Sequence, residues 1–364
     1  MRKGGPGRFL FLFHVDWRWI KQRPHFLSEE AERRGFRVVV LFKPNAARRS
    51  LPENPSVVHR RPLLPLPHSS RHGRITWVTR RLQRSYLALW CMCFRPNVVY
   101  LSHPVLGAVL PKRLRSKVRV VYDCMDDAVA MATPVDRPDV ATLENMLVTE
   151  ADYVLASSQH LVNVLQTRYH REVPLVRNGL SPEFLDVRTE DQSKDPVASH
   201  RLVALYVGTI GSWLDWDALR VLRDTFPGTV RLVGPRPVAG LVPSGIEVAG
   251  PIEHSAVAAL LMKSDLLLLP FARDDVAAAV DPLKLYEYVS SRRPIVARYL
   301  PELEPFRPFV TFYEQASEIG SAAETALRAA RPDADVVRQF LRPHLWSRRW
   351  ASIEGLLGEE IGRP

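Results

Sequence analysis

The chain has 364 residues, more than one hydrophobic core usually organises, so we expect two domains. Its composition, 46% hydrophobic and 24% charged, is typical of a globular protein, and no apolar run is long enough to span a bilayer as a helix, which argues against an integral membrane protein. The formal net charge of +11 indicates an acidic partner; nucleic acid, anionic lipid and phosphorylated metabolites all qualify.

Strands and helices alternate through the first half of the chain. Short apolar runs predict strands at 8–14, 36–42, 98–101, 118–122, 153–156 and 174–176. Helices are expected at 24–34, 139–151 and 159–169, and a proline-rich connection at 51–67. Strands separated by helices are typical of βαβ units, so we expect the first half to form a parallel sheet.

A basic, amphipathic helix is predicted after the proline-rich connection. Arginines alternate there with apolar side chains: Arg71, Arg74, Arg80, Arg81, Arg84, Ile75, Trp77, Val78, Leu82, Tyr86, Leu87 and Trp90. Such a helix suits an anionic membrane surface. A domain helix with solvated arginines is the commoner case, because amphipathicity is the normal state of surface helices.

A second set of alternating elements follows a polar, aperiodic segment at 181–199, which we interpret as a linker. Strands are predicted at 202–207, 230–233, 246–248, 266–269, 295–297 and 309–312. Helices are predicted at 216–226 and 255–262, after Asp281, from about residue 316, and across 335–361. Two successive α/β units of similar size predict a two-lobed protein with a cleft between the lobes.

The most informative stretch is Asp281-Pro282-Leu283-Lys284-Leu285-Tyr286-Glu287-Tyr288. Asp before Pro is typical of a helix start, where the Asp side chain accepts backbone N–H groups. A helix N-terminus beyond the carboxyl end of a parallel strand is suited to an anion. Lys284 and Glu287 are three residues apart and share one helix face. One can meet phosphate while the other accepts from hydroxyls, which indicates a nucleotide sugar.

Loops that contain glycine follow other strands of the second half. Val207-Gly208-Thr209-Ile210-Gly211 would let the backbone approach a ligand, although it lacks the GxGxxG pattern of dinucleotide sites and a tight turn also explains it. Arg236 can pair with a diphosphate, and Gly250-Pro251-Ile252 can offer backbone groups to a base. All three loops would lie at the carboxyl edge of one parallel sheet, where ligands bind.

The first half has its own candidates, each following a predicted strand or opening a helix. Trp17 can stack on a sugar ring, though core packing explains it as well. Gln22 and Arg23 open the first helix; for Arg23, contact with an acceptor or phosphate and a structural salt bridge both remain open. His103 follows the strand at 98–101, where a lone histidine is more often structural. Asp126-Asp127 follows the strand at 118–122.

At this point the chain resembles a known family through motifs that occur in the expected order. These are Gln22-Arg23-Pro24-His25-Phe26-Leu27, Tyr122-Asp123-Cys124-Met125-Asp126-Asp127, Glu150-Ala151-Asp152, Ala156-Ser157-Ser158, Arg177-Asn178-Gly179, Tyr206-Val207-Gly208-Thr209-Ile210 and Pro282-Leu283-Lys284-Leu285-Tyr286-Glu287-Tyr288. They resemble GT-B glycosyltransferases, specifically the glycosyltransferase-4-like group that includes teichuronic acid biosynthesis enzymes. The resemblance implies an α/β, GT-B fold with two Rossmann-like parallel-sheet domains facing each other across a cleft. It implies an acceptor domain at 1–180, a donor domain at 200–334, and a C-terminal helix at 335–364 that crosses back to the first domain.

The resemblance also implies roles for single residues. Glu287 matches the second glutamate of the group's Glu-x7-Glu signature, which accepts from donor ribose hydroxyls, whereas Ala279 stands where the first glutamate belongs. Catalytic roles are expected for Asp126, Lys284 and Arg236. Donor-binding residues are expected to be Gly208, Thr209, Ile210, Gly250, Pro251, Ile252, Asp281, Pro282, Leu283 and Glu287. Acceptor-binding residues are expected to be Trp17, Arg18, Gln22, Arg23, His103 and Asp127. No metal and no cofactor beyond the nucleotide-sugar co-substrate is expected.

The expected function is transfer of a sugar, with retention, from a nucleotide sugar to an envelope or exopolysaccharide precursor, which is a saccharide or lipid-linked saccharide. We expect a cytoplasmic protein, and the basic first domain suggests peripheral attachment to the inner face of the cell membrane. Three alternatives stay open. They are a nucleotide-sugar epimerase of the same fold, a non-catalytic scaffold, which Ala279 makes credible, and a nucleic-acid-binding protein, which only the charge suggests.

Overall fold

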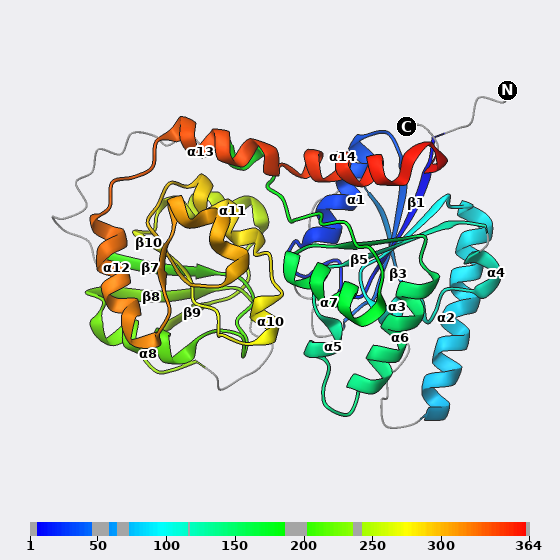
Figure 1. Ribbon diagram of the computed structural model, residues 1–364, viewed down its shortest axis with the longest axis horizontal. Helices are drawn as coiled ribbons and strands as arrows, with labels where there is room; N and C mark the ends of the chain where they lie inside the picture. Colours follow the sequence, from blue (N-terminus) through cyan, green and yellow to red (C-terminus); the bar gives the residue numbers. More distant parts are fainter. Residues whose placement is uncertain are drawn as a thin grey trace. The chain divides into compact units, whose positions relative to one another are not determined.

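The computed structural model describes residues 6–45, 58–63, 73–115, 117–185, 202–235 and 242–361. The chain forms two compact units (Figure 1). The first comprises Met1–Arg177 and Trp346–Pro364, and the second comprises Asn178–Leu345. The sequence places the return to the first unit at 335. In the structure it comes later, because Val337 and Leu341 pack into the core of the second unit.

The first unit is built on a parallel sheet with strand order β3-β2-β1-β4-β5-β6. Its strands are β1 (Arg8–Phe13), β2 (Arg37–Phe42), β3 (His59–Pro62), β4 (Val98–Leu101), β5 (Arg119–Cys124) and β6 (Tyr153–Ala156). Its helices are α1 (Arg23–Arg33), α2 (Gly73–Phe94), α3 (Pro104–Gly107), α4 (Lys112–Arg115), α5 (Ala128–Met131), α6 (Arg137–Glu150), α7 (Gln159–Tyr169) and α14 (Trp346–Leu357), followed by η7 (Gly358–Ile361). β1 is a continuous apolar run that is wholly buried from Phe9 to Phe13, as a parallel strand covered on both faces requires.

Helix α14 completes the core of the first unit from the far end of the sequence. It lies beside α1 (Figure 1). The indole of Trp346 stacks on Phe26 at 4.9 Å, and that of Trp350 meets Phe9 edge-on at 5.3 Å. Both tryptophans are buried, and aromatic side chains of this size contribute much of a core's stability.

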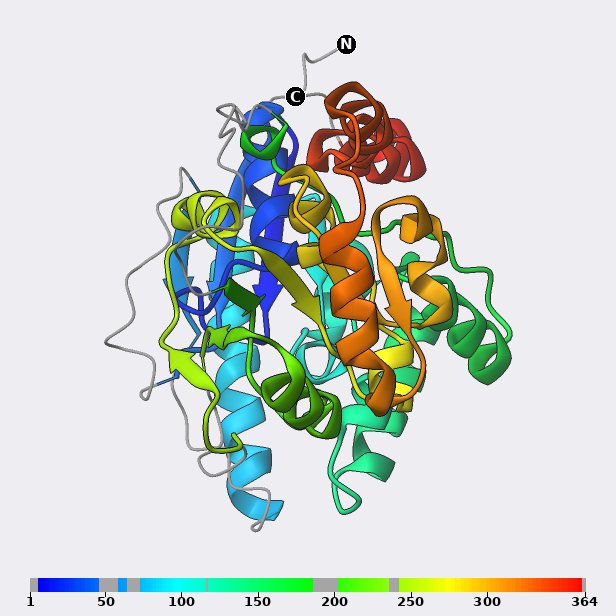
Figure 2. The ribbon, with the colours of Figure 1, turned by 90° about the vertical axis from the view of Figure 1, so that its left-hand side faces the viewer.

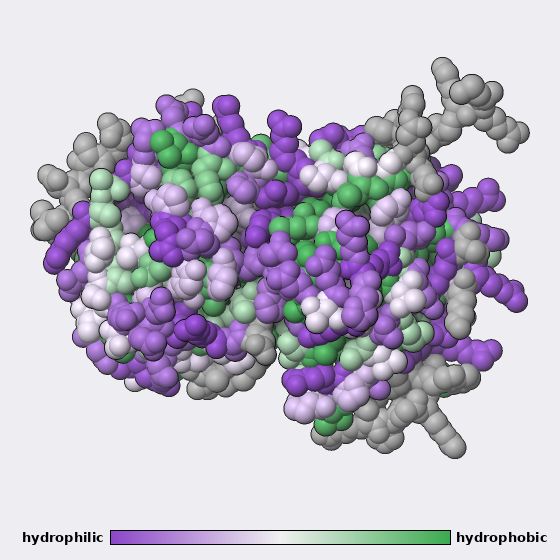
Figure 3. Space-filling view, in the orientation of Figure 1, coloured by the Kyte–Doolittle hydropathy of each residue, from purple (hydrophilic) through white to green (hydrophobic). Residues whose placement is uncertain are grey.

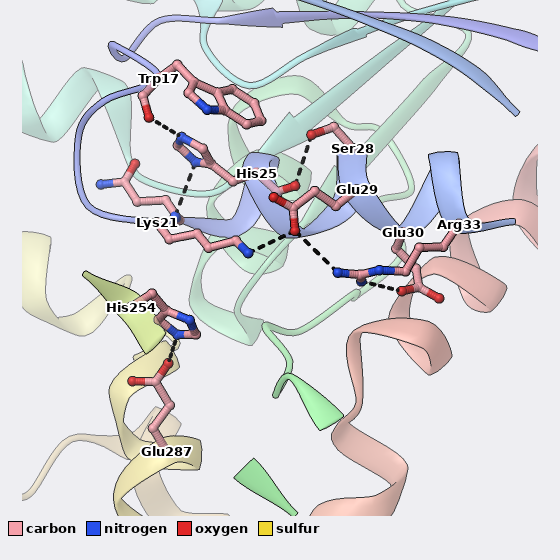
Figure 4. A network of polar contacts seen from close by, with 10 residues as sticks. Trp17, Lys21, His25, Ser28, Glu29, Glu30, Arg33, His254 and Glu287 are labelled. Carbon is pink, nitrogen blue, oxygen red and sulfur yellow. Dashed lines mark hydrogen bonds and ion pairs between the residues drawn. The ribbon is translucent and has the colours of Figure 1, made fainter. Parts of the chain in front are cut away.

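Helix α1 is almost entirely buried although it carries charged and polar side chains. Figure 4 shows how these are paired: Glu29 accepts from Lys21 at 2.8 Å, and the Nε2 of His25 lies 3.2 Å from the Trp17 carbonyl oxygen. Burial lowers the pKa of His25 to about 4, so this imidazole is neutral at pH 7. The Arg-Pro-His-Phe-Leu motif thus holds the helix in place.

The second unit has a parallel sheet with strand order β12-β11-β10-β7-β8-β9. Its strands are β7 (Leu202–Val207), β8 (Gly228–Val233), β9 (Glu247–Ala249), β10 (Leu266–Leu269), β11 (Ile295–Arg298) and β12 (Thr311–Tyr313). Its α-helices are α8 (Trp216–Thr225), α9 (Val257–Met262), α10 (Asp275–Ala278), α11 (Leu283–Ser290), α12 (Ile319–Arg328) and α13 (Ala334–Leu341). Its 3₁₀ segments are η2 (Pro182–Phe184), η3 (His254–Ala256), η4 (Pro301–Phe309), η5 (Ala316–Glu318) and η6 (Arg342–His344). Figure 2 shows α12 across the strands it covers.

Three predictions of local structure are wrong. β3 lies inside the predicted proline-rich connection, because a polar edge strand has no apolar run to reveal it and an edge tolerates Pro62. The predicted strand at 174–176 is a single bridge between Leu175 and Ala156. The predicted helix across 335–361 is interrupted at η6, which contains Pro343.

The surface seen in Figure 3 is mostly hydrophilic over both units. Among the described residues, no helix has the combination of length and hydropathy that crossing a bilayer requires.

Candidate functional site

Lys284 and Glu287 lie one turn apart on α11 in the second unit. The ammonium of Lys284 lies 5.6 Å from the centre of the Tyr206 ring, near the carboxyl end of β7. Burial lowers the pKa of Lys284, while the charge of Glu287 opposes this shift. The pair therefore places a partly desolvated cation and a carboxylate at the ligand-binding edge of this sheet.

Gly208 closes the turn against Lys284. Its φ of +150° is a backbone conformation that other residues rarely adopt, and a Cβ atom at this position would overlap the Lys284 side chain. Gly234, at the end of β8, would in turn overlap the Gly208 carbonyl if it carried a Cβ. Glycine is therefore needed here both for conformation and for the close approach of the lysine.

Glu287 is paired with a histidine that sequence reasoning did not single out. The Nε2 of His254 lies 2.7 Å from the Glu287 Oε1 (Figure 4), and the Phe184 ring lies 5.3 Å from the imidazole. Glu287 is only 5% exposed, so this hydrogen bond offsets part of the cost of burying its charge. His254 follows the Gly250-Pro251-Ile252 loop by two residues, but no motif marks it.

Asp281 has a different local role from the predicted helix cap. Helix α11 begins at Leu283, Pro282 is its N-cap, and no side chain caps it. The buried Asp281 carboxylate instead accepts from the Asn178 backbone N–H and from the Tyr286 hydroxyl. The Arg-Asn-Gly motif is explained by this contact, which ties the start of the second unit to α11.

The remaining donor candidates are placed around the same edge of the sheet. The Thr209 carbonyl accepts from the Tyr206 hydroxyl, and the Ile210 side chain is buried in the core. Gly250 is exposed and has open space where a Cβ would lie, while Pro251 and Ile252 are partly exposed. Arg236 lies outside the described residues, so its predicted role remains a prediction.

The acceptor candidates near the first helix make structural contacts. Trp17 is 1% exposed and stacks on Phe13 at 5.6 Å, so its indole is part of the core. Arg18 pairs with Asp16. Gln22 is the N-cap of α1, and its backbone N–H donates to the Nδ1 of His25.

Arg23 forms a buried, two-pronged salt bridge. Its Nε and one terminal nitrogen donate to Asp123 at 2.7 and 2.9 Å, and the other terminal nitrogen donates to the Arg177 carbonyl. Both side chains are almost fully buried. Of the two interpretations left open by the sequence, the salt bridge is the one that the geometry supports.

The two neighbouring aspartates after β5 have different surroundings. Asp127 caps α5 through the N–H groups of Val129 and Ala130, and it pairs with Arg168 at 2.9 Å. Burial, with a smaller contribution from the charge of Asp123, raises the pKa of Asp126 to about 6. A carboxyl group that changes charge near neutral pH is suited to proton transfer or to a sugar hydroxyl.

His103 caps the short helix α3, where its Nδ1 accepts the Val105 N–H. Its ring lies 4.7 Å from that of His14. Among the described residues, no group of three or more His, Cys, Asp and Glu side chains is arranged to hold a metal ion.

Comparison with known proteins places this geometry in context. The chain matches the family Glycosyltransferase Family 4 over residues 25–184. It is 24% identical over 230 residues to TuaH of Bacillus subtilis (strain 168), whose name assigns it to teichuronic acid biosynthesis as a glycosyltransferase. That match covers 57% of this chain and 57% of TuaH, so the chain spans just over half the length of this relative.

Solved structures match over almost the whole chain. Sucrose-phosphate synthase from Thermosynechococcus elongatus has a TM-score of 0.74 at 14% identity, with 96% of this chain and 98% of that chain covered. Anabaena Alr3699/HepE in complex with UDP has a TM-score of 0.64 at 14% identity, with 96% and 99% covered. At such identities the likeness shows the fold.

Two six-stranded parallel sheets in two units, together with these neighbours, define the class as a two-domain, Rossmann-like GT-B protein. Within that fold, residues 25–184 are similar to Glycosyltransferase Family 4, and 230 residues of the chain are similar to TuaH.

Proposed function

We propose that this protein is a nucleotide-sugar-dependent glycosyltransferase that transfers a hexose-like sugar, with retention, to an envelope or exopolysaccharide precursor. The observation that carries the proposal is the juxtaposition of Lys284, Glu287 and the Gly208 turn in the second unit. The names of TuaH and of the UDP complex of Alr3699/HepE support the choice of donor and acceptor class.

The chemistry follows from the charges. A departing nucleoside diphosphate gains negative charge, which the Lys284 ammonium and the start of α11, where no side chain caps the helix, would stabilise. Glu287 would accept from ribose hydroxyls while it keeps its hydrogen bond to His254. Ala279 is buried, so the donor sugar is held without the acidic side chain that the Glu-x7-Glu signature provides there.

The test measures nucleoside diphosphate binding as a shift in the melting temperature of the protein. A ligand that binds the native state raises the stability of that state by mass action. Glu287→Gln should abolish the shift given by uridine or guanosine diphosphate. Glu324→Gln, on the exposed face of α12, makes the same charge change and should keep it. Equal shifts in both variants would refute the donor site, and release of nucleoside diphosphate without an acceptor would refute transfer to a saccharide.

We propose further that α2 attaches the protein to an anionic membrane surface. Val78, Leu82, Leu89 and Met92 are 47–63% exposed and lie on one helix face, while Leu87 and Cys91 on the opposite face are buried. Arg81, on the exposed side, adds positive charge. An apolar stripe beside arginine is the pattern of an interfacial helix, which is more than solvated arginines alone would need.

Vesicle sedimentation tests the attachment. The protein should bind vesicles with phosphatidylglycerol and not vesicles of phosphatidylcholine alone, and binding should weaken as salt rises. The double variant Leu82→Glu, Leu89→Glu should remain in solution, whereas Val336→Glu, at an exposed apolar position on α13, should bind normally. Binding by the double variant would exclude α2 as the attachment surface.

A further inference from the structure

Three basic side chains meet at the carboxyl edge of the first sheet. Lys43 directly follows β2, His14 directly follows β1, and Ser102-His103 follow β4. Because β2, β1 and β4 are consecutive parallel neighbours in the sheet, their carboxyl ends lie side by side.

The histidines contact each other directly. Their ring centres are 4.7 Å apart, and the His14 Nδ1 lies 3.2 Å from the Ser102 hydroxyl oxygen. The Nδ1 of His103 accepts the Val105 N–H, which places the ring proton of the neutral form on Nε2. His103 therefore keeps a donor for a ligand, and within the described part of the chain no hydrogen bond to Nε2 is formed.

Both imidazoles of the cluster are held in their neutral form at pH 7. Burial lowers the pKa of His14 well below its usual value, and His103 and Lys43 lower it further. Burial and Lys43 lower the pKa of His103 to about 4, and burial lowers that of Lys43. Asp126 lies two residues beyond the end of the neighbouring strand β5, and its carboxyl group, with a pKa raised to about 6, is mostly charged at pH 7. Beyond burial, the charge of Lys43 therefore disfavours protonation of both histidines, and a bound anion would offset this effect.

We propose that His14, His103 and Lys43 bind an anionic group, a phosphate or a carboxylate, on the acceptor saccharide. This inference rests on the proposed transferase function. The bound anion would accept charge-assisted hydrogen bonds from the two imidazoles and the ammonium, which a neutral saccharide cannot do. The enzyme would then select acidic acceptors, such as sugar phosphates or uronate-containing chains.

Binding of an anion should be accompanied by proton uptake. Each imidazole has a lower pKa in the free protein than beside an anion, so the affinity should rise as pH falls through the higher, bound-state pKa. It should level off near the free-state pKa of His103, about 4. A carboxylate probe loses its own charge near pH 4, so a phosphate probe is needed at the acidic end.

The experiment follows the imidazole nitrogens of the full-length, ¹⁵N-labelled protein by NMR, with His14→Gln and His103→Gln to assign the two rings. Inorganic phosphate, glucose 6-phosphate and glucuronate are titrated against neutral glucose. We expect saturable protonation of both rings by the phosphates, and by glucuronate if a carboxylate also fits. Glucose should have no effect. The proposal would be overturned if no anion changes the protonation of the two imidazole rings, or if glucose changes it equally.

Substitutions at the lysine separate a binding role from a structural one. Lys43→Met should weaken phosphate binding by about tenfold or more, as expected for the loss of a charged hydrogen-bond partner, and Lys43→Arg should largely restore it. Lys117→Met is the matched control, since Lys117 is exposed and lies at the opposite, amino-terminal edge of the sheet. Equal weakening by the control would contradict the proposal.

Nucleoside diphosphate binding to the donor site is measured separately. If Lys43→Met abolishes nucleoside diphosphate binding as well, the cluster holds the donor's phosphates and the acceptor assignment is wrong. If nucleoside diphosphates bind but the cluster binds no anion, the acceptor proposal is wrong and the proposed transferase function is retained. If the cluster binds phosphate but no nucleoside diphosphate stabilises the protein, the transferase fails instead.

Discussion

At the scale of single residues, the second unit combines a cation, a carboxylate and a histidine on elements that the fold brings together. The period of α11 places Lys284 and Glu287 on one face, and this could be predicted from their spacing. The His254–Glu287 hydrogen bond joins residues 33 positions apart, and only the folded sheet reveals it. For the same reason, a structural salt bridge of Arg23 could be considered from the sequence, but its partner Asp123 could not be named.

The hydrogen bond from His254 should matter for donor affinity. His254→Ala leaves the Glu287 carboxylate buried without this partner, and hydrogen bonds to charged groups contribute about 1.5–3 kcal/mol. We therefore expect donor binding to weaken by about tenfold, measured by calorimetry with nucleoside diphosphate. His160→Ala in the first unit serves as the control. Tighter binding in His254→Ala would show instead that the imidazole competes with the ligand for Glu287.

Asp126 should give the proposed transfer reaction a pH dependence. With a pKa of about 6, its carboxyl group is charged above pH 6 and neutral below. If the charged form acts on the acceptor, kcat/KM should rise through about pH 6 and then stay level. Asp126→Asn should remove this step, while Asp217→Asn, at an exposed position, should not. An unchanged profile in Asp126→Asn would exclude the role.

The same pKa has a consequence for stability. A carboxyl group whose pKa is higher in the folded than in the unfolded state makes folding less favourable as pH rises from about 4 to 6. Asp126→Asn removes that cost and should raise the free energy of unfolding at pH 7 by up to about 3 kcal/mol, as measured by urea titration. A variant that is less stable at pH 7 would contradict the raised pKa.

At the scale of secondary-structure elements, the predictions were correct where an element has a characteristic pattern of apolar residues in its own sequence. The strands at 98–101, 153–156, 202–207 and 266–269 coincide with β4, β6, β7 and β10, because parallel strands buried on both faces are apolar throughout. β3 was missed because its residues are polar and lie at an edge. Helix α14 could be predicted as a helix from its own sequence. Its packing on β1 could not, because the two elements are far apart in the chain.

Trp350 should therefore be a major contributor to the stability of the first unit. Trp350→Ala removes a fully buried indole from contact with Phe9, Phe11 and Phe36, and such truncations cost about 3–5 kcal/mol. Leu356→Ala, at an exposed position of the same helix, should cost little. Urea unfolding of both variants checks this, and comparable losses would mean that α14 is not anchored through its indoles.

At the scale of the whole molecule, the fold class and the two-unit organisation could be predicted from the alternation of strands and helices along the chain. The chemistry of each unit could be predicted only in part, because it depends on which loops meet at the carboxyl edge of each sheet. The order of the strands in the sheet determines which loops are neighbours, and this order cannot be predicted from any single segment of the sequence. His14, Lys43 and His103 meet because β2, β1 and β4 are neighbours although α2 separates them in sequence.

The proposed transfer reaction should not depend on a metal ion. Lys284 and the start of α11 supply the positive charge that a divalent cation would otherwise give to a leaving diphosphate. We expect nucleoside diphosphate affinity and turnover to be the same in EDTA as in magnesium. Activity that disappears in EDTA and returns with magnesium would contradict this proposal.

The return of α14 to the first unit also orders events during synthesis. A nascent chain would lack the indoles that cover Phe9, Phe26 and Phe36 until Trp346 and Trp350 have left the ribosome, and by then every residue of the second unit has already been made. The unit translated first is thus the last to be completed, and its unfinished aromatic surface is where a chaperone would be needed during translation.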